Sequence, residues 1–492
     1  MPAPDQAVLD RRHEIARRLR AIVPGEGVID SLDELRAYET DGLTAYRQMP
    51  LLVVLPETTA QVAAILRYCQ EEKLKVVPRG AGTSLSGGAL PLADGIVLGL
   101  SKFNCILEVD LDNRCAVVQP GVTNLAISEA VEHAGFYYAP DPSSQIACTI
   151  GGNVAENSGG VHCLKYGLTT NNLLGLEVVL IDGTVLRLGG KHNAAAGYDW
   201  LGLLTGSEGL LAVVTEVTVR LLRKPESARA LLLGFPSSEA AGACVGAVIA
   251  AGIIPGGMEM MDRPAIHATE AFAKAGYPLD VEALLIVELD GVAVEVDHLL
   301  QEVQAIAKRQ GAVFARASQD EAERERFWAG RKAAFPAVGR IADYYCMDGT
   351  IPRKALPRVL HRMREMESEF GLRVANVFHA GDGNLHPLIL YDANDADQLD
   401  RAERFGAAIL RLCVEVGGVL TGEHGVGVEK RDLMGTMFDE TDLAVQQRLK
   451  CAFDPAGLLN PGKVFPVLHR CAELGRMHVR GGQLAFPDLP RF

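Results

Sequence analysis

Positively charged residues are in the minority in this 492-residue chain, which has 48 Lys and Arg against 62 Asp and Glu and a formal net charge of −14. A sequence-independent grip on nucleic acid or anionic lipid needs a surplus of cations, so we expect no nucleic-acid partner. Long apolar runs are also missing, because the longest stretch, residues 241–254, is too short to span a bilayer. No apolar segment typical of a signal peptide follows the charged N-terminus. We therefore expect a cytoplasmic protein.

Cysteine is sparse as well, with ten residues and no pair at C-x-x-C spacing. This excludes a disulfide scaffold and makes a thiolate-bound zinc or iron–sulfur centre within the chain improbable. Glycine is abundant by contrast, at 51 residues without a G-X-Y period, above the usual share of about 7%. The positions of that excess glycine are therefore informative.

Apolar periodicity predicts alternating strands and helices, hence an α+β chain. From residue 229 the order strand, helix, strand, helix, strand predicts a compact ferredoxin-like sheet with helices on one face. No long linker or internal repeat is visible. We expect an N-terminal helical segment, a cofactor domain, a substrate and metal domain and a C-terminal helical segment, at residues 1–47, 48–225, 226–420 and 421–492.

Three polar, glycine-rich loops concentrate in the expected cofactor domain. The first, residues 78–88, follows a strand and can offer backbone N–H groups to a phosphate. Leu85 stands where a dinucleotide G-x-G-x-x-G fingerprint needs glycine, and no P-loop motif occurs. Alone, this loop leaves an ordinary turn as the alternative. With the loops at 140–160 and 206–211, it predicts a long cradle for a dinucleotide.

Two histidine-containing motifs indicate a metal site. Folding residues 372–391 as a hairpin with a loop at 381–384 places His379 opposite His386, with β-carbons roughly 4.5–5.5 Å apart. Glu423 and His424 are adjacent, so in extended backbone they point to opposite sides. One of them can complete a His₂-carboxylate metal set while the other faces a substrate. The alternatives are surface histidines beside a turn and an ordinary polar loop.

The sequences PRGAGTSLSGG at 78–88, PDPSSQIACTIGGNVAENSGG at 140–160 and GSEGLLAVVTEVTV at 206–219 resemble the FAD-binding domain of PCMH-type flavoproteins of the vanillyl-alcohol-oxidase kind. The resemblance implies FAD as the cofactor. It is expected to be non-covalent, because the first loop has no histidine. The implied FAD contacts are Arg79, Gly80, Ala81, Gly82, Thr83, Ser84, Pro142, Cys148, Thr149, Gly152, Asn153, Ser158, Gly160, Glu208 and Val214.

HAGDGNLHP at 379–387 and GEHGVG at 422–427 resemble the C-terminal domain of FAD-linked D-2-hydroxy-acid dehydrogenases. The resemblance implies that a divalent metal (Zn, Mn or Fe) is bound by His379, His386 and Glu423. It also implies that His424 is the acid/base and that Arg331 holds the substrate carboxylate. Asn460 is implied to reach toward the flavin. Cys346 and Leu388 stand where relatives that act on D-2-hydroxyglutarate carry Lys and Asn, which favours a short substrate.

The resemblance thus implies oxidation of an anionic 2-hydroxy acid, glycolate or D-lactate, to the 2-oxo acid by hydride transfer to FAD N5. It also implies that electrons leave through a second FAD-binding subunit and an iron–sulfur subunit to a quinone, not to NAD. Contact of this chain with the inner face of the cell membrane is then expected to be only indirect, through these partner subunits. One alternative is a self-sufficient D-lactate or D-2-hydroxy-acid dehydrogenase. Another is a non-catalytic FAD-binding assembly subunit.

Overall fold

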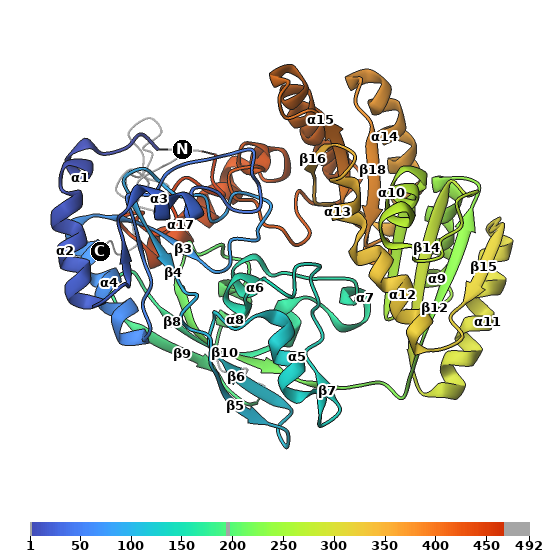
Figure 1. Cartoon of the computed structure of the whole chain (residues 1–492), viewed down its shortest axis with the longest axis horizontal. Helices are drawn as coiled ribbons and strands as arrows, with labels where there is room; N and C mark the ends of the chain where they lie inside the picture. Colours follow the sequence, from blue (N-terminus) through green and yellow to red (C-terminus); the bar gives the residue numbers. More distant parts are fainter. Residues whose placement is uncertain (1, 193–196, 467–492) are drawn as a thin grey trace, which may run out of the picture.

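A computed structural model describes residues 2–192 and 197–466 of the chain (Figure 1). Two sheets and their helices form one half of the molecule, on the left in Figure 1, and a seven-stranded sheet forms the other. The expected α+β architecture is confirmed. None of the helices within the described ranges combines the length and the apolar character needed to cross a membrane.

A four-stranded sheet in the order β1-β2-β4-β3 opens the first half. The strands β2, β4 and β3 run parallel, and α4 begins after Thr58, whose side chain accepts a hydrogen bond from the backbone of Gln61. These elements and the N-terminal helices lie within residues 6–99 of the chain. Their bounds are α1 Gln6–Asp10, α2 Arg12–Ile22, β1 Val28–Ile29, α3 Leu32–Leu35, β2 Leu52–Val54, α4 Thr59–Glu72, β3 Lys75–Arg79 and β4 Gly95–Gly99.

A five-stranded antiparallel sheet in the order β5-β6-β10-β8-β9 completes this half. The polar stretch at 78–88 begins at the end of β3, and the stretch at 140–160 contains the short helix α6. The bounds are β5 Ile106–Asp110, β6 Cys115–Val118, α5 Asn124–Glu132, β7 Phe136–Tyr137, α6 Ile150–Glu156, α7 Cys163–Tyr166, β8 Leu173–Val179, β9 Val185–Gly189, α8 Trp200–Leu204, β10 Val213–Arg220 and β11 Leu222–Arg223.

The second half is a seven-stranded antiparallel sheet in the order β15-β12-β14-β13-β18-β20-β16. The sequence did not indicate β13 or the helix α10 that follows it. The six residues of β13 are all buried, so its Met-rich sequence has no alternation of apolar and polar residues to reveal a strand. The strand bounds are β12 Ser227–Phe235, β13 Gly257–Asp262, β14 Ala283–Gly291, β15 Phe314–Ala317, β16 Asp343–Cys346, β17 Gly349–Thr350, β18 Val374–Phe378, β19 Asn384–Leu385 and β20 Pro387–Tyr391.

Helices cover both faces of this sheet, so the prediction of helices on one face is wrong. Leu231 and Leu233 of β12 pack into the core with α9, α11, α14 and α15, whereas Ala230 and Leu232 pack into the core with α10, α12 and α13. A strand buried on both faces is a continuous apolar run, as in β12. The helix bounds are α9 Ser238–Ala250, α10 Arg263–Ala273, α11 Ala293–Arg309, α12 Glu321–Lys332, α13 Ala334–Val338, α14 Leu356–Phe370 and α15 Ala396–Glu415.

The C-terminal segment returns to the first half, where Figure 1 shows α17 beside β3. After α16 (Met434–Met437) and α17 (Glu440–Phe453), Leu459 forms a parallel bridge with Val76 of β3. Lys450 of α17 donates to the carbonyl of Leu210 at 2.6 Å. The end of the expected C-terminal segment, residues 467–492, lies outside the described residues.

Candidate active site

The three glycine-rich loops meet around a cavity of about 520 Å³. Of the residues expected to contact FAD, those that line this cavity are Arg79, Gly80, Ala81, Gly82, Thr83, Ser84, Pro142, Cys148, Thr149, Gly152, Asn153, Ser158, Glu208 and Val214. The same cavity is also lined by His386, Glu423 and His424. A cofactor cradle and the histidine motifs therefore share one space, although they come from opposite halves of the chain.

The first loop fits a phosphate-bearing cofactor. A Cβ at Gly80 would lie 2.5 Å from Thr149 Oγ1, and Gly82 has φ +71, so a side chain is excluded at the first position and strained at the second. Thr149 Oγ1 is itself buried and has no hydrogen-bond partner within the described residues. Backbone at these glycines can approach a ligand closely, and the Thr149 hydroxyl is free to bind it. These residues fit the FAD cradle.

Gly160 and Asn460 do not line the cavity. Asn460 is 1% exposed and donates to the carbonyls of Gly88 and Glu208 at 2.9 and 2.7 Å. It therefore ties the first loop to the third and supports the cradle from behind. A Cβ at Gly160 would lie 2.4 Å from the carbonyl oxygen of Asp141, so this glycine permits a close approach within the second loop.

Cys148 lies in the cavity wall with its Sγ 3.5 Å from Asn153 Nδ2. Burial raises the pKa of this thiol, which keeps it protonated. A protonated thiol is a poor nucleophile. This supports the prediction of a dissociable flavin.

The two motif histidines meet, but by a different register from the one expected. Asn376 of β18 faces Pro387 of β20, and His379 faces Asn384, so the predicted pairing of His379 with His386 is wrong by two residues. A shift of two residues leaves every side chain on its original face of the sheet. The two imidazole rings therefore still lie together, with centroids 4.9 Å apart.

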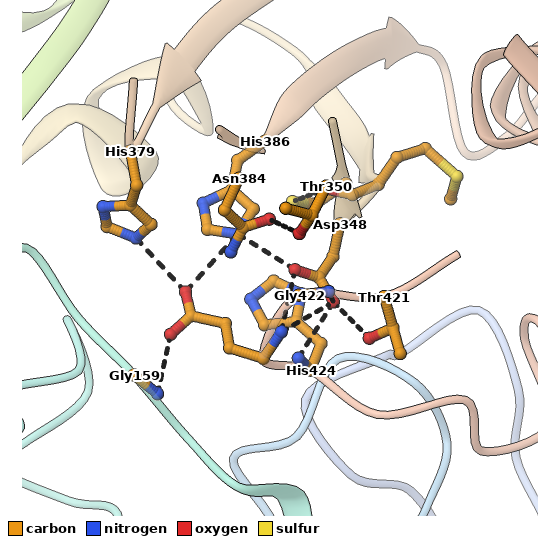
Figure 2. A network of polar contacts seen from close by, with 12 residues as sticks. Gly159, Asp348, Thr350, His379, Asn384, His386, Thr421, Gly422 and His424 are labelled. Carbon is orange, nitrogen blue, oxygen red and sulfur yellow. Dashed lines mark hydrogen bonds and ion pairs between the residues drawn. The ribbon is translucent and has the colours of Figure 1, made fainter. Parts of the chain in front are cut away.

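Glu423 completes the group. Figure 2 shows His379 and His386 pointing at one unlabelled carboxylate, which is that of Glu423 because it also accepts a hydrogen bond from the backbone of Gly159. Glu423 Oε1 lies 3.2 Å from His379 Nε2 and 3.4 Å from His386 Nε2. Burial opposes ionisation, but the hydrogen bond and charge of His379 lower the pKa of Glu423 to about 2. The second nitrogen of His386, Nδ1, is buried without a partner among the described residues. Three converging donors of imidazole and carboxylate type fit a divalent metal.

Glu259 stands behind His379 and was not anticipated from the sequence. Its carboxylate is 2.8 Å from His379 Nδ1 and 2.7 Å from Arg331 Nη2. Metal-binding histidines commonly have such a carboxylate on their second nitrogen, which fixes the ring. The available signal was an acidic residue inside the otherwise apolar GMEMM stretch at 257–261.

Asp348 is a second unanticipated residue, fully buried against the loop at 421–424 (Figure 2). Its carboxylate accepts hydrogen bonds from the Thr421 hydroxyl and from the backbone of Gly422, Glu423 and His424. Lys430 Nζ, also fully buried, lies 3.1 Å away. Burial opposes ionisation, yet Lys430 holds the pKa of Asp348 well below its usual value. Asp348 therefore fixes the backbone that carries Glu423 and His424.

The imidazole of His424 stacks on that of His386, with centroids 4.7 Å apart and planes 5° apart, and lines the cavity. Its carbonyl accepts a hydrogen bond from Ser84 of the first loop at 3.3 Å. Burial lowers the pKa of His424 to about 4, so the ring is neutral at physiological pH. Figure 2 shows His424 below His386. It lies between the group of His379, His386 and Glu423 and the loops of the cradle.

Arg331 lies behind the histidines, only 1% exposed, and is not part of the cavity wall. Besides its ion pair with Glu259, its Nε and Nη1 have no hydrogen-bond partner within residues 2–192 and 197–466. The adjacent Lys332 does line the cavity. Two cations therefore lie close to the histidine group, one of them with unsatisfied donors.

Both halves of the chain match known protein families. Residues 50–189 match the family described as "FAD binding domain", and residues 224–464 match "FAD linked oxidases, C-terminal domain". "Glycolate oxidase subunit GlcD" of Escherichia coli K12 is 58% identical over 482 residues, 98% of this chain and 97% of the relative. The protein of that name from Bacillus subtilis is 38% identical over 92% of this chain and 97% of its own. "D-lactate dehydrogenase" of Archaeoglobus fulgidus is 35% identical over 88% and 95%.

Among solved structures, substrate-bound p-cresol methylhydroxylase superposes with a TM-score of 0.78. The match covers 94% of this chain and 98% of the other at 17% identity, so it supports the fold alone.

Proposed function

Because the chain belongs to the FAD-linked oxidases and is an FAD-dependent hydroxy-acid dehydrogenase, we propose that it oxidises glycolate to glyoxylate, and D-lactate to pyruvate. The observation that carries this proposal is the shared cavity. Loops that fit FAD and the group of His386, Glu423 and His424 line the same space, so a small hydroxy acid there contacts both. The names of the relatives support a hydroxy acid as the substrate.

In the proposed reaction FAD supplies the hydride acceptor, and a divalent metal on His379, His386 and Glu423 supplies Lewis-acid chemistry toward the substrate oxygens. His424 faces the cavity as a neutral imidazole and accepts the proton of the substrate hydroxyl as the C2 hydride leaves. Lys332 lines the cavity and provides positive charge for an anionic substrate in an acidic protein. Arg331, which the resemblance assigns to the substrate carboxylate, lies behind the cavity wall in its ion pair with Glu259. Glu259 and Asp348 hold the ligand side chains in place.

We further propose that the electrons pass to a second FAD-binding subunit and an iron–sulfur subunit, and through them to a membrane quinone. The sequence has no C-x-x-C spacing for a cluster of its own, and the E. coli relative is named as a subunit. The second candidate, a self-sufficient D-lactate dehydrogenase, is favoured by the Archaeoglobus relative. One experiment distinguishes the subunit from the self-sufficient enzyme. The isolated chain is given D-lactate or glycolate, and its rate of oxidation with a dye acceptor is compared with its rate with quinone.

Anaerobic titration of the flavin tests the central proposal. Glycolate is expected to bleach the flavin of the unmodified chain, and no bleaching by glycolate or D-lactate would leave only a non-catalytic assembly subunit. His424→Ala should retain FAD but be reduced roughly 10²–10⁴-fold more slowly. His361→Ala, at an exposed histidine on α14, is the matched control and should be unchanged. Equal reduction rates in His424→Ala and the control would reject His424 as the base.

The metal assignment is tested separately by metal content. His386→Ala should purify with FAD but with little of the divalent metal found in the unmodified chain, because one of three ligands is lost. A full metal complement in His386→Ala would remove this residue from the ligand set.

A further inference from the structure

Phe335, at the start of α13, has no role in the proposed reaction. Its ring stands between His386 and the hydrophobic core of the seven-stranded sheet. It lines the cavity together with Lys332 and His386. Its ring lies edge-on to the imidazole of His386, with centroids 6.0 Å apart at 74°. On its other side it packs edge-on to Tyr344 of β16, with centroids 6.1 Å apart.

An apolar surface continues behind this ring. Tyr344 and Cys346 of β16 pair with Leu390 and Leu388 of β20, and both Leu388 and Cys346 are buried. Alternate residues of a strand share a face, so Leu388 and Leu390 follow His386 along one side of β20. Phe335 packs against the core cluster that contains Cys346 and Leu388. The surface leading away from His386 is therefore the Phe335 ring, backed by side chains without charge.

We infer that Phe335 limits the length of the substituent on C2 of the substrate, restricting the enzyme to glycolate and D-lactate. This inference rests on the proposed function. A hydrogen or methyl group on C2 leaves the Phe335 ring in place, whereas a longer chain directed along β20 meets it. A carboxylate there would also be desolvated against uncharged side chains, which is costly.

The test compares kcat/KM for D-2-hydroxybutyrate and glycolate in the FAD-loaded chain with a dye acceptor. Removing the ring in Phe335→Ala should raise the ratio of the two values about tenfold. The ethyl group of D-2-hydroxybutyrate exceeds the methyl group that the ring admits by one methylene, and one methylene group in an apolar pocket discriminates by at least about tenfold. Phe335→Leu keeps part of the packing and should give a smaller rise, so it remains informative if the alanine variant folds poorly. D-2-hydroxyglutarate should gain less than D-2-hydroxybutyrate.

Phe272→Ala is the matched control, because this partly exposed phenylalanine of α10 lies against Arg340 and does not line the cavity. It should leave the ratio unchanged. An unchanged ratio in folded, FAD-containing Phe335→Ala and Phe335→Leu would overturn the inference. So would an equal or larger gain for D-2-hydroxyglutarate, because the surface would then not behave as apolar. Failure of the unmodified chain to oxidise glycolate would instead overturn the proposed function.

Discussion

The flavin cradle and the histidine group share one cavity but are built by opposite means. The cradle is made largely of backbone, from loops at 78–88, 140–160 and 206–211, and glycines allow that backbone to approach a ligand closely. The histidine group, which consists of His379, His386, Glu423 and His424, is made of side chains that other buried charges hold in place. Examples are Glu259 behind His379, and Lys430 beside Asp348, which holds the backbone of Glu423 and His424. We therefore expect a substitution in the cradle to affect only its own surroundings, whereas a substitution in or beside the histidine group should affect several of its side chains together.

The largest effect is expected for Asp348→Asn. This change removes the carboxylate that accepts a hydrogen bond from the fully buried Lys430, whose other carboxylate neighbour, Glu429, is farther away at 3.8 Å. It also weakens the hydrogen bonds that hold residues 421–424. Breaking one side of a buried ion pair costs about 3–5 kcal/mol. The free energy of unfolding from urea titrations of the FAD-loaded chain should fall by that amount.

The double variant Asp348→Asn with Lys430→Met serves as the control. It removes the unpaired charge, so part of the lost stability should return. If the double variant is as unstable as the sum of the two single variants, the pair does not act as a unit and the contrast with the cradle weakens.

A smaller effect is expected at His162, where the two regions join. The ring lies 2.9 Å from Asp141 in the second loop and 3.1 Å from Glu288 of the substrate sheet, and Arg324 and Trp328 also contact Glu288. Burial opposes protonation, but the charges of Asp141 and Glu288 raise the pKa of His162 well above its usual value. The stability it contributes is therefore full below about pH 6.5 and is lost as pH rises through the raised pKa.

The measurement is the free energy of unfolding as a function of pH, compared with His162→Gln. Their difference should be about 1–2 kcal/mol near pH 6 and should shrink in alkaline solution. Taking the difference cancels other buried groups that titrate in this range, such as Glu429, whose pKa burial raises to about 8. A difference that stays constant from pH 6 to the alkaline limit would show that His162 contributes by packing only.

The same contrast explains what could be predicted from the sequence. The individual residues of the cradle are implied by the family resemblance, which is carried by motifs that are local in the sequence, and of these residues only Gly160 and Asn460 fall outside the cavity wall. The histidines were found, but their register was wrong by two residues, since the turn at 380–383 and not the pattern decides it. Glu259 and Asp348 were missed because their partners lie 120 and 82 positions away along the chain.

The smallest effect is expected for Gly82→Ala in the cradle. Gly82 has φ +71, where a Cβ is strained, and the new methyl group would also meet the Arg79 guanidinium, which is the movable end of a side chain. The cost should be about 1 kcal/mol, which weakens FAD binding roughly fivefold in fluorescence titrations of the apoprotein. Gly246→Ala, on α9 with no heavy atom within 4 Å of the added carbon, is the control and should not change FAD affinity. Metal content should be the same in both variants, because the ligand side chains are held by Glu259 and Asp348 and not by the first loop. Loss of metal in Gly82→Ala alone would show that the two regions depend on each other, through the contact of Ser84 with His424.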